Sequence, residues 1–292
     1  MMDAATIHDR FRERGFIVDE AFATALQIML ALEKPLLIEG PAGVGKTESA
    51  KVLAEVLGTD VIRLQCYEGL DAMAALYEWN YPRQMLHARL SEAEGSSLEE
   101  REAYMFSDKF LLKRPLLDAI TRDRSPVLLI DEVDRADEAF EAYLLELLSD
   151  FQLSIPELGT VHATSRPMVV ITSNGTRELS DALRRRCLYQ FIDYPDHAKE
   201  LAIVRKKAPD AGAELAQQIV SFVQAVRRMD LQKKPGIAET LDWTAALLRM
   251  GISVIDDDGA ERILETLSAL VKTRGDRAGF TREVVARIAA AC

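Results

Sequence analysis

Hydrophobic residues form short, solid runs in the first two-thirds of the chain. Each run is bounded by polar, Gly or Pro residues, and each is too short for a helix of ordinary length. Solid apolar runs of this kind are typical of strands in a parallel sheet that is covered by helices on both faces. The predicted strands are Leu36–Glu39, Val61–Gln65, Val127–Asp131, Met168–Ser173 and 188–192.

Helical spacing appears between these runs. Residues 3–34 read as helical, with Phe16, Ile17 and Val18 beginning the approach to the loop after the first strand. A later segment has apolar residues at i, i+3, i+4, i+7 and i+8, the pattern of an amphipathic helix; they are Phe140, Tyr143, Leu144, Leu147 and Leu148. Residues 151–155 and 160–163 flank a Pro- and Gly-containing turn, which predicts a hairpin.

The period becomes helical throughout from about Pro195 onward. The alternation of strands and helices therefore ends there, and we expect an α/β domain over residues 1–195 and a helical domain over residues 196–292. Residues 66–126 are too many for a plain connection, so this segment is expected to hold helices and an insertion, with an acidic stretch at 91–102.

Residues 40–47 read GPAGVGKT and stand between the first strand and the next helix. This is the pattern G-x-x-x-x-G-K-[ST], in which glycines let backbone N–H groups point at phosphate oxygens and the helix adds its positive end. Lys46 is placed to reach the β- and γ-phosphates, and the Thr47 hydroxyl to bind Mg²⁺. The residues assigned to nucleotide binding here are Ile17, Val18, Gly40, Pro41, Ala42, Gly43, Val44, Gly45, Lys46, Thr47 and Glu48.

Two carboxylates follow the third predicted strand. Parallel strands deliver such residues to the carboxyl edge of the sheet, where ligands of open α/β sheets bind. We expect Asp131 to hold Mg²⁺ through water and Glu132 to orient and deprotonate the attacking water. The alternative is a strand end whose charges simply meet solvent, and the nearby phosphate-binding motif argues against it.

Polar residues also follow the next strand and a short helix. Asn174 ends the fourth strand and is expected to bond the attacking water or the γ-phosphate, although Asn-Gly is also a common turn dipeptide. Residues 184–186 are three arginines at a helix end. Such cations often form a solvated face, but in a ring an arginine supplied to the neighbouring subunit stabilises the transferring phosphoryl group. We favour Arg186, then Arg185, for this role.

Composition narrows the class of partner. The chain has 292 residues, 48% of them apolar, and a net charge of −11. This charge argues against broad binding to nucleic acids, which requires a basic surface. Three dispersed cysteines predict no disulfide framework and fit a reducing cytoplasm. We expect no signal peptide and no membrane span, and membrane contact that is at most peripheral, at the inner face.

The order of these motifs resembles the AAA+ ATPases. The resemblance covers about residues 15–195, with GPAGVGKT as Walker A, LLIDEVD as Walker B, Asn174 as sensor 1 and ALRRRC as the arginine-finger region. It implies a P-loop domain with a central parallel sheet, a helical lid, ATP and Mg²⁺ as ligands, and a homo-oligomeric ring with six subunits as the family expectation.

A narrower resemblance is carried by three segments. KPLLIEGPAGVGKTESAKVLAEVLG, the long segment after the second strand and the hairpin resemble the MoxR branch, which implies a helix-2 insertion within residues 66–89 and a hairpin before sensor 1. IPELGTVHATSRPMVVITSNGTRELSDALRRRC and KPGIAETLDWTAALLRMG resemble the CoxD-like ATPases. That likeness implies maturation of a molybdenum enzyme such as CO dehydrogenase, with a partner that carries a von Willebrand factor A domain.

One departure concerns the lid. Many family members carry a sensor 2 arginine at the start of a lid helix, but residues 238–243 hold none, and Arg249 comes about two turns later. Either Arg249 takes this role or sensor 2 is absent. The leading hypothesis is an ATP-driven chaperone of a client metalloenzyme. The alternatives are a slowly hydrolysing, nucleotide-regulated adaptor and a motor that acts on nucleic acid.

Overall fold

The computed structural model describes residues 2–91, 100, 104–107, 109–156 and 158–292. It divides into two compact units, which we describe separately. The sheet unit holds residues 2–3, 24–39 and 50–190, and the helical unit holds Ala4–Ala23, Gly40–Ser49 and Phe191–Cys292. The predicted division into residues 1–195 and 196–292 stays a prediction.

A five-stranded sheet forms the centre of the sheet unit, in the order β2-β5-β8-β1-β9. Its strands are β1 (Leu36–Glu39), β2 (Val61–Gln65), β5 (Val127–Asp131), β8 (Met168–Ser173) and β9 (Leu188–Phe191). The pairs β2–β5, β5–β8 and β8–β1 are parallel. Every residue of β5 is buried, as the solid apolar run predicts for a strand covered on both faces.

The flanking helices begin and end where local chemistry allows. In α8 (Glu138–Asp150), the Asp137 carboxylate accepts from the backbone N–H of Phe140 at 2.8 Å, and Phe151 ends the helix in the left-handed region. In α3 (Lys46–Leu57), Gly58 follows the last residue with φ 63°, a conformation that suits glycine at the end of a helix. The other helices of this part are α2 (Glu20–Leu32), α7 (Pro115–Thr121), α9 (Asp181–Arg186) and the 3-10 turn η1 (Val133–Arg135).

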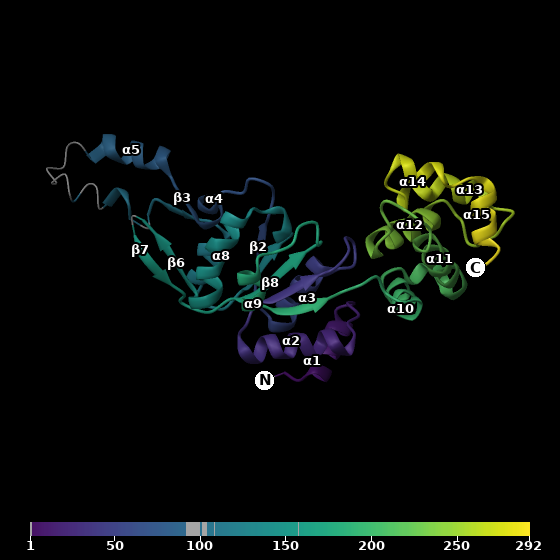
Figure 1. Ribbon diagram of the computed structural model, residues 1–292, viewed down its shortest axis with the longest axis horizontal. Helices are drawn as coiled ribbons and strands as arrows, with labels where there is room; N and C mark the ends of the chain where they lie inside the picture. Colours follow the sequence, from purple (N-terminus) through teal and green to yellow (C-terminus); the bar gives the residue numbers. More distant parts are fainter. Residues whose placement is uncertain (1, 92–99, 101–103, 108, 157) are drawn as a thin grey trace. The chain divides into compact units, whose positions relative to one another are not determined.

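Two small hairpins extend from the sheet unit. The predicted hairpin before β8 is confirmed as β6 (Gln152–Ile155) paired with β7 (Gly159–His162). The segment after β2 holds α4 (Ala72–Leu76), β3 (Tyr77–Trp79), α5 (Tyr81–Ser91) and β4 (Leu111–Lys113), with β3 and β4 antiparallel. Figure 1 shows α5 and the β6–β7 hairpin toward the same end of this unit. The acidic stretch at 91–102 lies almost entirely outside the described residues.

Helices make up the C-terminal part of the helical unit, as predicted. They are α10 (His197–Lys207), η2 (Pro209–Ala211), α11 (Gly212–Arg227), α12 (Ile237–Arg249), α13 (Ala260–Thr266), η3 (Leu267–Ala269), α14 (Arg274–Ala278) and α15 (Arg282–Ala289). Their shared core contains Trp243, whose ring lies 4.9 Å from that of Phe222 and whose indole N–H donates to Thr266 at 2.7 Å.

The structure differs from the sequence-based expectations at four places. Residues 3–34 form two helices, because α1 (Ala4–Glu13) ends before Gly15 (φ 76°) and α2 begins at Glu20. Residues 16–18 therefore precede α2 and do not lead directly into the loop after β1. Tyr143 is 50% exposed, so it does not belong to the buried stripe of α8, and the β3–β4 pair was not predicted.

In the described part of the chain, no helix has both the length and the apolar character needed to cross a membrane.

The two neighbouring residues Tyr143 and Leu144 provide a matched test of the α8 packing. Leu144 is fully buried, so Leu144→Ala is expected to lower the free energy of unfolding by about 2–5 kcal/mol. Tyr143→Ala removes a half-exposed ring and is expected to cost about 1 kcal/mol or less. Urea denaturation followed by circular dichroism measures both, and equal losses would contradict the assigned faces of α8.

Candidate functional site

The loop after β1 has the backbone geometry that its glycines predict. Gly43 and Gly45 have φ values of 79° and 99°, which side-chain-bearing residues rarely adopt. A Cβ at Gly40 would lie 2.0 Å from the carbonyl oxygen of Ile192, so this position admits only glycine. The side chain of Lys46 is buried, and its ammonium donates to the carbonyls of Gly40 and Pro41 at 2.7 Å each.

Helix α3 starts at the end of this loop. The N–H of Ser49 donates to the carbonyl of Gly45 at 3.0 Å, and the Ser49 hydroxyl donates to the carbonyl of Lys46 at 2.6 Å. Thr47 and Glu48 therefore lie in the first turn of α3. A helix start that follows a glycine-rich loop favours an anion such as phosphate.

Residues 16–18 belong to the same unit as the loop, although α2 separates them from it in sequence. The edge of the Phe16 ring lies 3.4 Å from where a Gly45 Cβ would be. Val18 is buried and Ile17 is half-buried. The helical unit thus contains the phosphate loop, Ile17 and Val18 from the predicted nucleotide-binding set.

Asp131 lies at the end of β5 with both carboxylate oxygens occupied. Oδ2 accepts from the guanidinium of Arg63 at 2.5 and 3.0 Å, and Oδ1 accepts from the Thr172 hydroxyl at 2.6 Å. The Asp131 side chain is 2% exposed, whereas that of Arg63 is 49% exposed. A buried carboxylate requires such partners, and these hold Asp131 in place at the sheet edge.

Glu132 has an unusual backbone for its residue type. Its φ and ψ are 56° and 50°, a left-handed conformation that costs about 1–3 kcal/mol in a non-glycine residue. Its N–H donates to the Thr172 hydroxyl at 2.9 Å, and its carboxylate meets Arg135 at 3.2 Å. Thr172 therefore bonds both Asp131 and Glu132, so the strained turn is held by the neighbouring strand β8.

Cys66 lies beside this edge. Its N–H donates to the Asp131 carbonyl at 2.8 Å. Burial, followed by the charges of Asp131, Asp134 and Glu132, raises the pKa of the Cys66 thiol to about 12.

A further carboxylate, Asp134, joins the turn after β5 to the loop after β8. Asp134 accepts from the N–H of Asn174 at 3.1 Å, and from the N–H and hydroxyl of Thr176 at 3.0 and 2.6 Å. Burial alone raises the pKa of Asp134, but the hydrogen bonds from Thr176 and Asn174 outweigh it and leave the pKa below its ordinary value. These bonds position the backbone of Asn174 next to the end of β5.

The three arginines at the end of α9 have partners within the sheet unit. Arg184 lies 3.5 Å from Glu39, Arg185 lies 2.7 Å from Asp181, and Arg186 donates to the Ser149 hydroxyl at 2.5 Å. Arg185 and Arg186 are exposed. Their roles in catalysis stay predictions.

Buried contacts with α8 set the position of α9. Glu141 is 1% exposed, pairs with Arg177 and accepts from the backbone N–H of Ser180 at 2.9 Å. The Ser180 hydroxyl in turn caps α9 by accepting from the N–H of Leu183. The direction in which α9 presents its arginines therefore depends on Glu141.

Arg249 is the last residue of α12 and is exposed. The first residue of α12, Ile237, donates its N–H to the carbonyl of Gly43 at 2.8 Å. Twelve residues of α-helix separate the two positions by about 18 Å. The end of α12 that meets the phosphate loop is thus the end without an arginine, and sensor 2 activity of Arg249 stays a prediction.

Each unit, taken by itself, offers groups that fit one part of ATP with Mg²⁺. In the helical unit, the loop offers the buried ammonium of Lys46, which suits a phosphate. In the sheet unit, the end of β5 offers the carboxylate of Asp131, which suits a divalent cation. Bound Mg²⁺ supplies neutralisation of charge on the phosphate oxygens.

Sequence reasoning missed Arg63, Thr172 and Asp134. Each had a faint signal: Arg63 is a charged residue inside an apolar strand, Thr172 is a hydroxyl among Val and Ile, and Asp134 is a third acidic residue after β5. None of these signals names its partner, because the partners lie about 40 or more residues away in sequence.

Comparison with known proteins identifies the family. The model of the AAA domain (dynein-related subfamily) matches residues 35–187, more than half of the chain. The denitrification regulatory protein NirQ of Stutzerimonas stutzeri is 26% identical over 229 residues, covering 75% of this chain and 74% of NirQ. The gas vesicle ATPase GvpN of Ancylobacter aquaticus is 29% identical over 275 residues, covering 87% of this chain and 71% of GvpN.

A solved structure supports the fold alone. A mutant of Thermotoga maritima RuvB matches with a TM-score of 0.50 at 20% identity, covering 87% of this chain and 70% of RuvB. The chain belongs to the AAA domain family, in its dynein-related subfamily. It is an AAA+ ATPase that uses ATP with Mg²⁺, which confirms the predicted fold class, activity and cofactors.

The contacts of Asp134 generate a prediction about pH. Because its pKa is lowered in the folded state, its stabilising contribution is present above the unfolded value of about 3.9 and is lost as the pH falls through the folded pKa. Asp134→Asn is expected to lower the free energy of unfolding by about 1–3 kcal/mol at pH 7. Chemical denaturation from pH 7 to pH 3 measures the difference between wild type and variant.

That difference is expected to be constant above about pH 5 and to shrink below about pH 4. Thr176→Val, which removes one donor to Asp134, serves as the control and is expected to show a weaker pH dependence. A difference that stays constant down to pH 3 would show that the charged form of Asp134 is not favoured by folding.

Proposed function

We propose that this chain is the motor subunit of a MoxR-like AAA+ ring that remodels a client metalloenzyme. The proposal has three parts: a nucleotide site formed by the phosphate loop and the sheet edge, a ring in which an arginine acts on the neighbouring subunit, and a client whose metal centre is completed by the ATP-driven motion. A different observation supports each part.

The strand order carries the first part. β5 and β8 are adjacent, and β8 is adjacent to β1, so Asp131, Glu132 and Asn174 leave the sheet at the same edge as the chain that enters the phosphate loop. In this assignment, Lys46 and the loop bind the phosphates, and Asp131 and Thr47 hold the metal. Glu132 receives the proton of the attacking water, and Asn174 orients that water.

Exposure of the arginines at the end of α9 supports the second part. Arg186 donates to the Ser149 hydroxyl of α8 and to the Ala182 carbonyl within its own helix. Such contacts are exchangeable at a subunit interface. A head-to-tail interface that supplies Arg186 to the next subunit's nucleotide closes naturally into a ring, for which we propose six subunits.

The third part rests on resemblance and on the relatives. NirQ is named a regulatory protein of denitrification and GvpN a gas vesicle ATPase, so related ATPases serve different systems. The segments that resemble CoxD-like ATPases favour a molybdenum hydroxylase such as CO dehydrogenase as the client, with a von Willebrand A-domain partner. We assign the β6–β7 hairpin and the segment at 66–89 to the two insertions that the resemblance to the MoxR branch implies.

A mixing experiment tests the site and the ring together. Glu132→Gln is expected to lower ATP hydrolysis by about 10²–10⁴-fold, and Arg186→Ala by about 10³-fold or more. If Arg186 acts on the neighbour, an equal mixture re-forms complete sites at about a quarter of the interfaces, because each needs an intact Glu132 and an intact Arg186 from different subunits. Steady-state ATPase assays measure the recovery, with mass photometry following the ring.

Arg185→Ala is the matched control for the mixture, and it is expected to retain most of the wild-type activity. Activity that does not recover on mixing would exclude action of Arg186 on a neighbouring subunit. Hydrolysis by wild type that is no faster than by Glu132→Gln would favour the adaptor, and hydrolysis stimulated by DNA would favour the nucleic-acid motor.

A co-expression experiment tests the client. An apo molybdenum hydroxylase of the CO dehydrogenase type is expressed with wild type or with Glu132→Gln, each together with a von Willebrand A-domain partner. We expect a several-fold higher specific activity of the hydroxylase with wild type, because only wild type couples hydrolysis to motion. Equal specific activity and equal metal content in both preparations would rule out this client.

A further inference from the structure

The phosphate loop and the start of α12 meet backbone to backbone. The N–H of Ile237 donates to the carbonyl of Gly43 at 2.8 Å. A Cβ at Gly236 would lie 2.8 Å from the Cα, C and O atoms of Gly43, closer than any side chain tolerates. The loop and this helix therefore approach each other only because Gly43 and Gly236 are both glycines.

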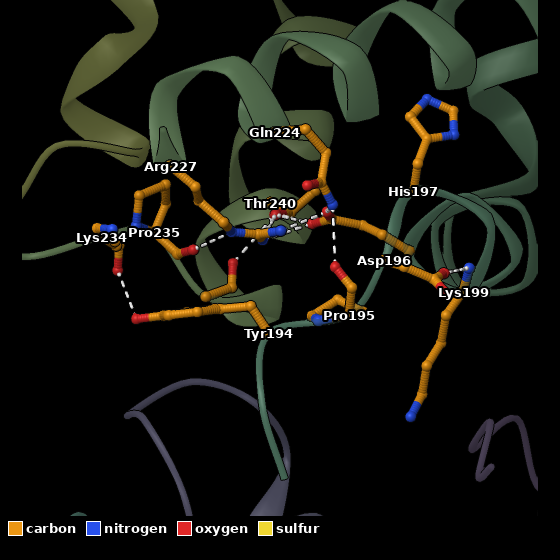
Figure 2. A network of polar contacts seen from close by, with 12 residues as sticks. Tyr194, Pro195, Asp196, His197, Lys199, Gln224, Arg227, Lys234, Pro235 and Thr240 are labelled. Atoms are coloured by element: carbon orange, nitrogen blue, oxygen red, sulfur yellow. Dashed lines mark hydrogen bonds and ion pairs between the residues drawn. The ribbon is translucent and has the colours of Figure 1, made fainter. Parts of the chain in front are cut away.

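A buried ion pair holds the segment that precedes α12. The Arg227 guanidinium donates to the two carboxylate oxygens of Glu200 at 2.5 and 2.6 Å, and its Nε donates to the carbonyl of Pro235 at 2.7 Å. Thr240 completes the arrangement, since its hydroxyl donates to Glu200 at 2.8 Å. Figure 2 shows Arg227 between Pro235 and Thr240.

This pair is rigid because of its burial. Glu200 is 0% exposed and Arg227 is 6% exposed, and a charge that is buried to this degree keeps the geometry that satisfies it. A bidentate arginine also fixes direction as well as distance. The position of Pro235, and with it that of Gly236, is therefore set by α10 and α11, the helices that carry Glu200 and Arg227.

The same pair also holds the chain that leads into the C-terminal helices. The amide of Gln224 donates to Glu200 at 2.8 Å and to the carbonyl of Pro195 at 3.0 Å, and Arg227 lies 5.2 Å from the centre of the Tyr194 ring. Figure 2 shows Tyr194 and Pro195 beside this network. One buried pair thus contacts both the segment before α10 and the segment before α12.

The loop meets a carboxylate at this place. Glu239 accepts from the N–H of Gly236 at 2.9 Å as part of a capping box, and its Oε2 lies 3.1 Å from where a Gly43 Cβ would be. This carboxylate is committed to the helix cap. Contact between the loop and α12 is therefore made by backbone groups, and the Glu200–Arg227 pair sets the position of α12 in this contact. Arg249 lies at the far end of α12.

We propose that the Gly43–Gly236 contact, positioned by the Glu200–Arg227 pair, is the mechanical link between the nucleotide and the C-terminal helices of this chain. A change in the conformation of the phosphate loop moves the carbonyl of Gly43, and the bond to Ile237 transmits this movement to α12. Glu200 and Arg227 are positioning residues that make α10, α11 and α12 follow together. This inference rests on the proposed nucleotide site.

Gly236→Ala tests the link directly. The φ of Gly236 is −89°, which suits alanine. The substitution therefore acts through the clash with Gly43 and not through backbone strain. We expect the dissociation constant of a fluorescent ADP analogue to rise by about fivefold or more, as for an ordinary coupling between two sites. We also expect ADP to slow hydrogen exchange over residues 237–243 in wild type but not in Gly236→Ala.

Two control variants separate the link from general damage. Gly275→Ala places its Cβ 3.4 Å from a Gln232 side chain and is expected to bind ADP like wild type. Ile263→Val removes one methylene group from the buried core of the C-terminal helices. Ile263 does not contact the loop, and ADP binding is expected to be unchanged. If Ile263→Val weakens ADP binding as much as Gly236→Ala does, the effect is one of stability and the proposed link is wrong.

The two possible failures are distinguishable in the same experiment. If wild type does not bind ADP, or if Lys46→Ala binds ADP as wild type does, the proposed nucleotide site is wrong. If wild type binds ADP and shows protection over residues 40–49, but Gly236→Ala matches it in affinity and in protection of α12, the nucleotide site stands and the link is overturned.

Discussion

The parallel pairing of β5 with β2 on one side and with β8 on the other determines where the polar residues at the end of β5 lie. This pairing puts the ends of three buried strands next to one another, so that polar groups separated by about 40 or more residues in sequence become hydrogen-bond partners. A slip of one residue in the β5–β8 register would point Thr172 away from Asp131 and remove its bond to Glu132.

The two carboxylates Asp131 and Asp134 at this edge are bound by different sets of partners. Asp131 is held by Arg63 and Thr172, whereas Asp134 is held by backbone and hydroxyl donors of the loop after β8. The pKa of the Cys66 thiol beside this edge is raised to about 12, first by burial and then by the charges of Asp131, Asp134 and Glu132. An edge of this kind suits an ATPase that binds Mg²⁺, since the cation and the phosphates bring charges that the fixed groups complement.

The helical unit also holds a buried carboxylate by pairing it with an arginine. Its core is apolar around Trp243, but it also buries the Glu200–Arg227 pair, which contributes direction more than stability. A buried bidentate pair holds the elements that carry it in one arrangement, because bending it would leave a charge without a partner.

Sequence by itself determined the elements and the principal chemistry. Local periodicity and short motifs predict the five strands of the central sheet, α8, the hairpin before β8, the GPAGVGKT loop and the Asp131–Glu132 pair. Each of these features depends on residues that are close together in the chain. The break between α1 and α2 and the exposure of Tyr143 did not follow, because a period alone does not say where a helix turns or how wide its buried face is. Only the tertiary structure decided that Arg63 and Thr172 hold Asp131, that Asp134 holds the loop of Asn174, and that Gly236 meets Gly43. Those contacts arise from strand order and helix packing, which bring distant residues together by geometry that no local pattern contains.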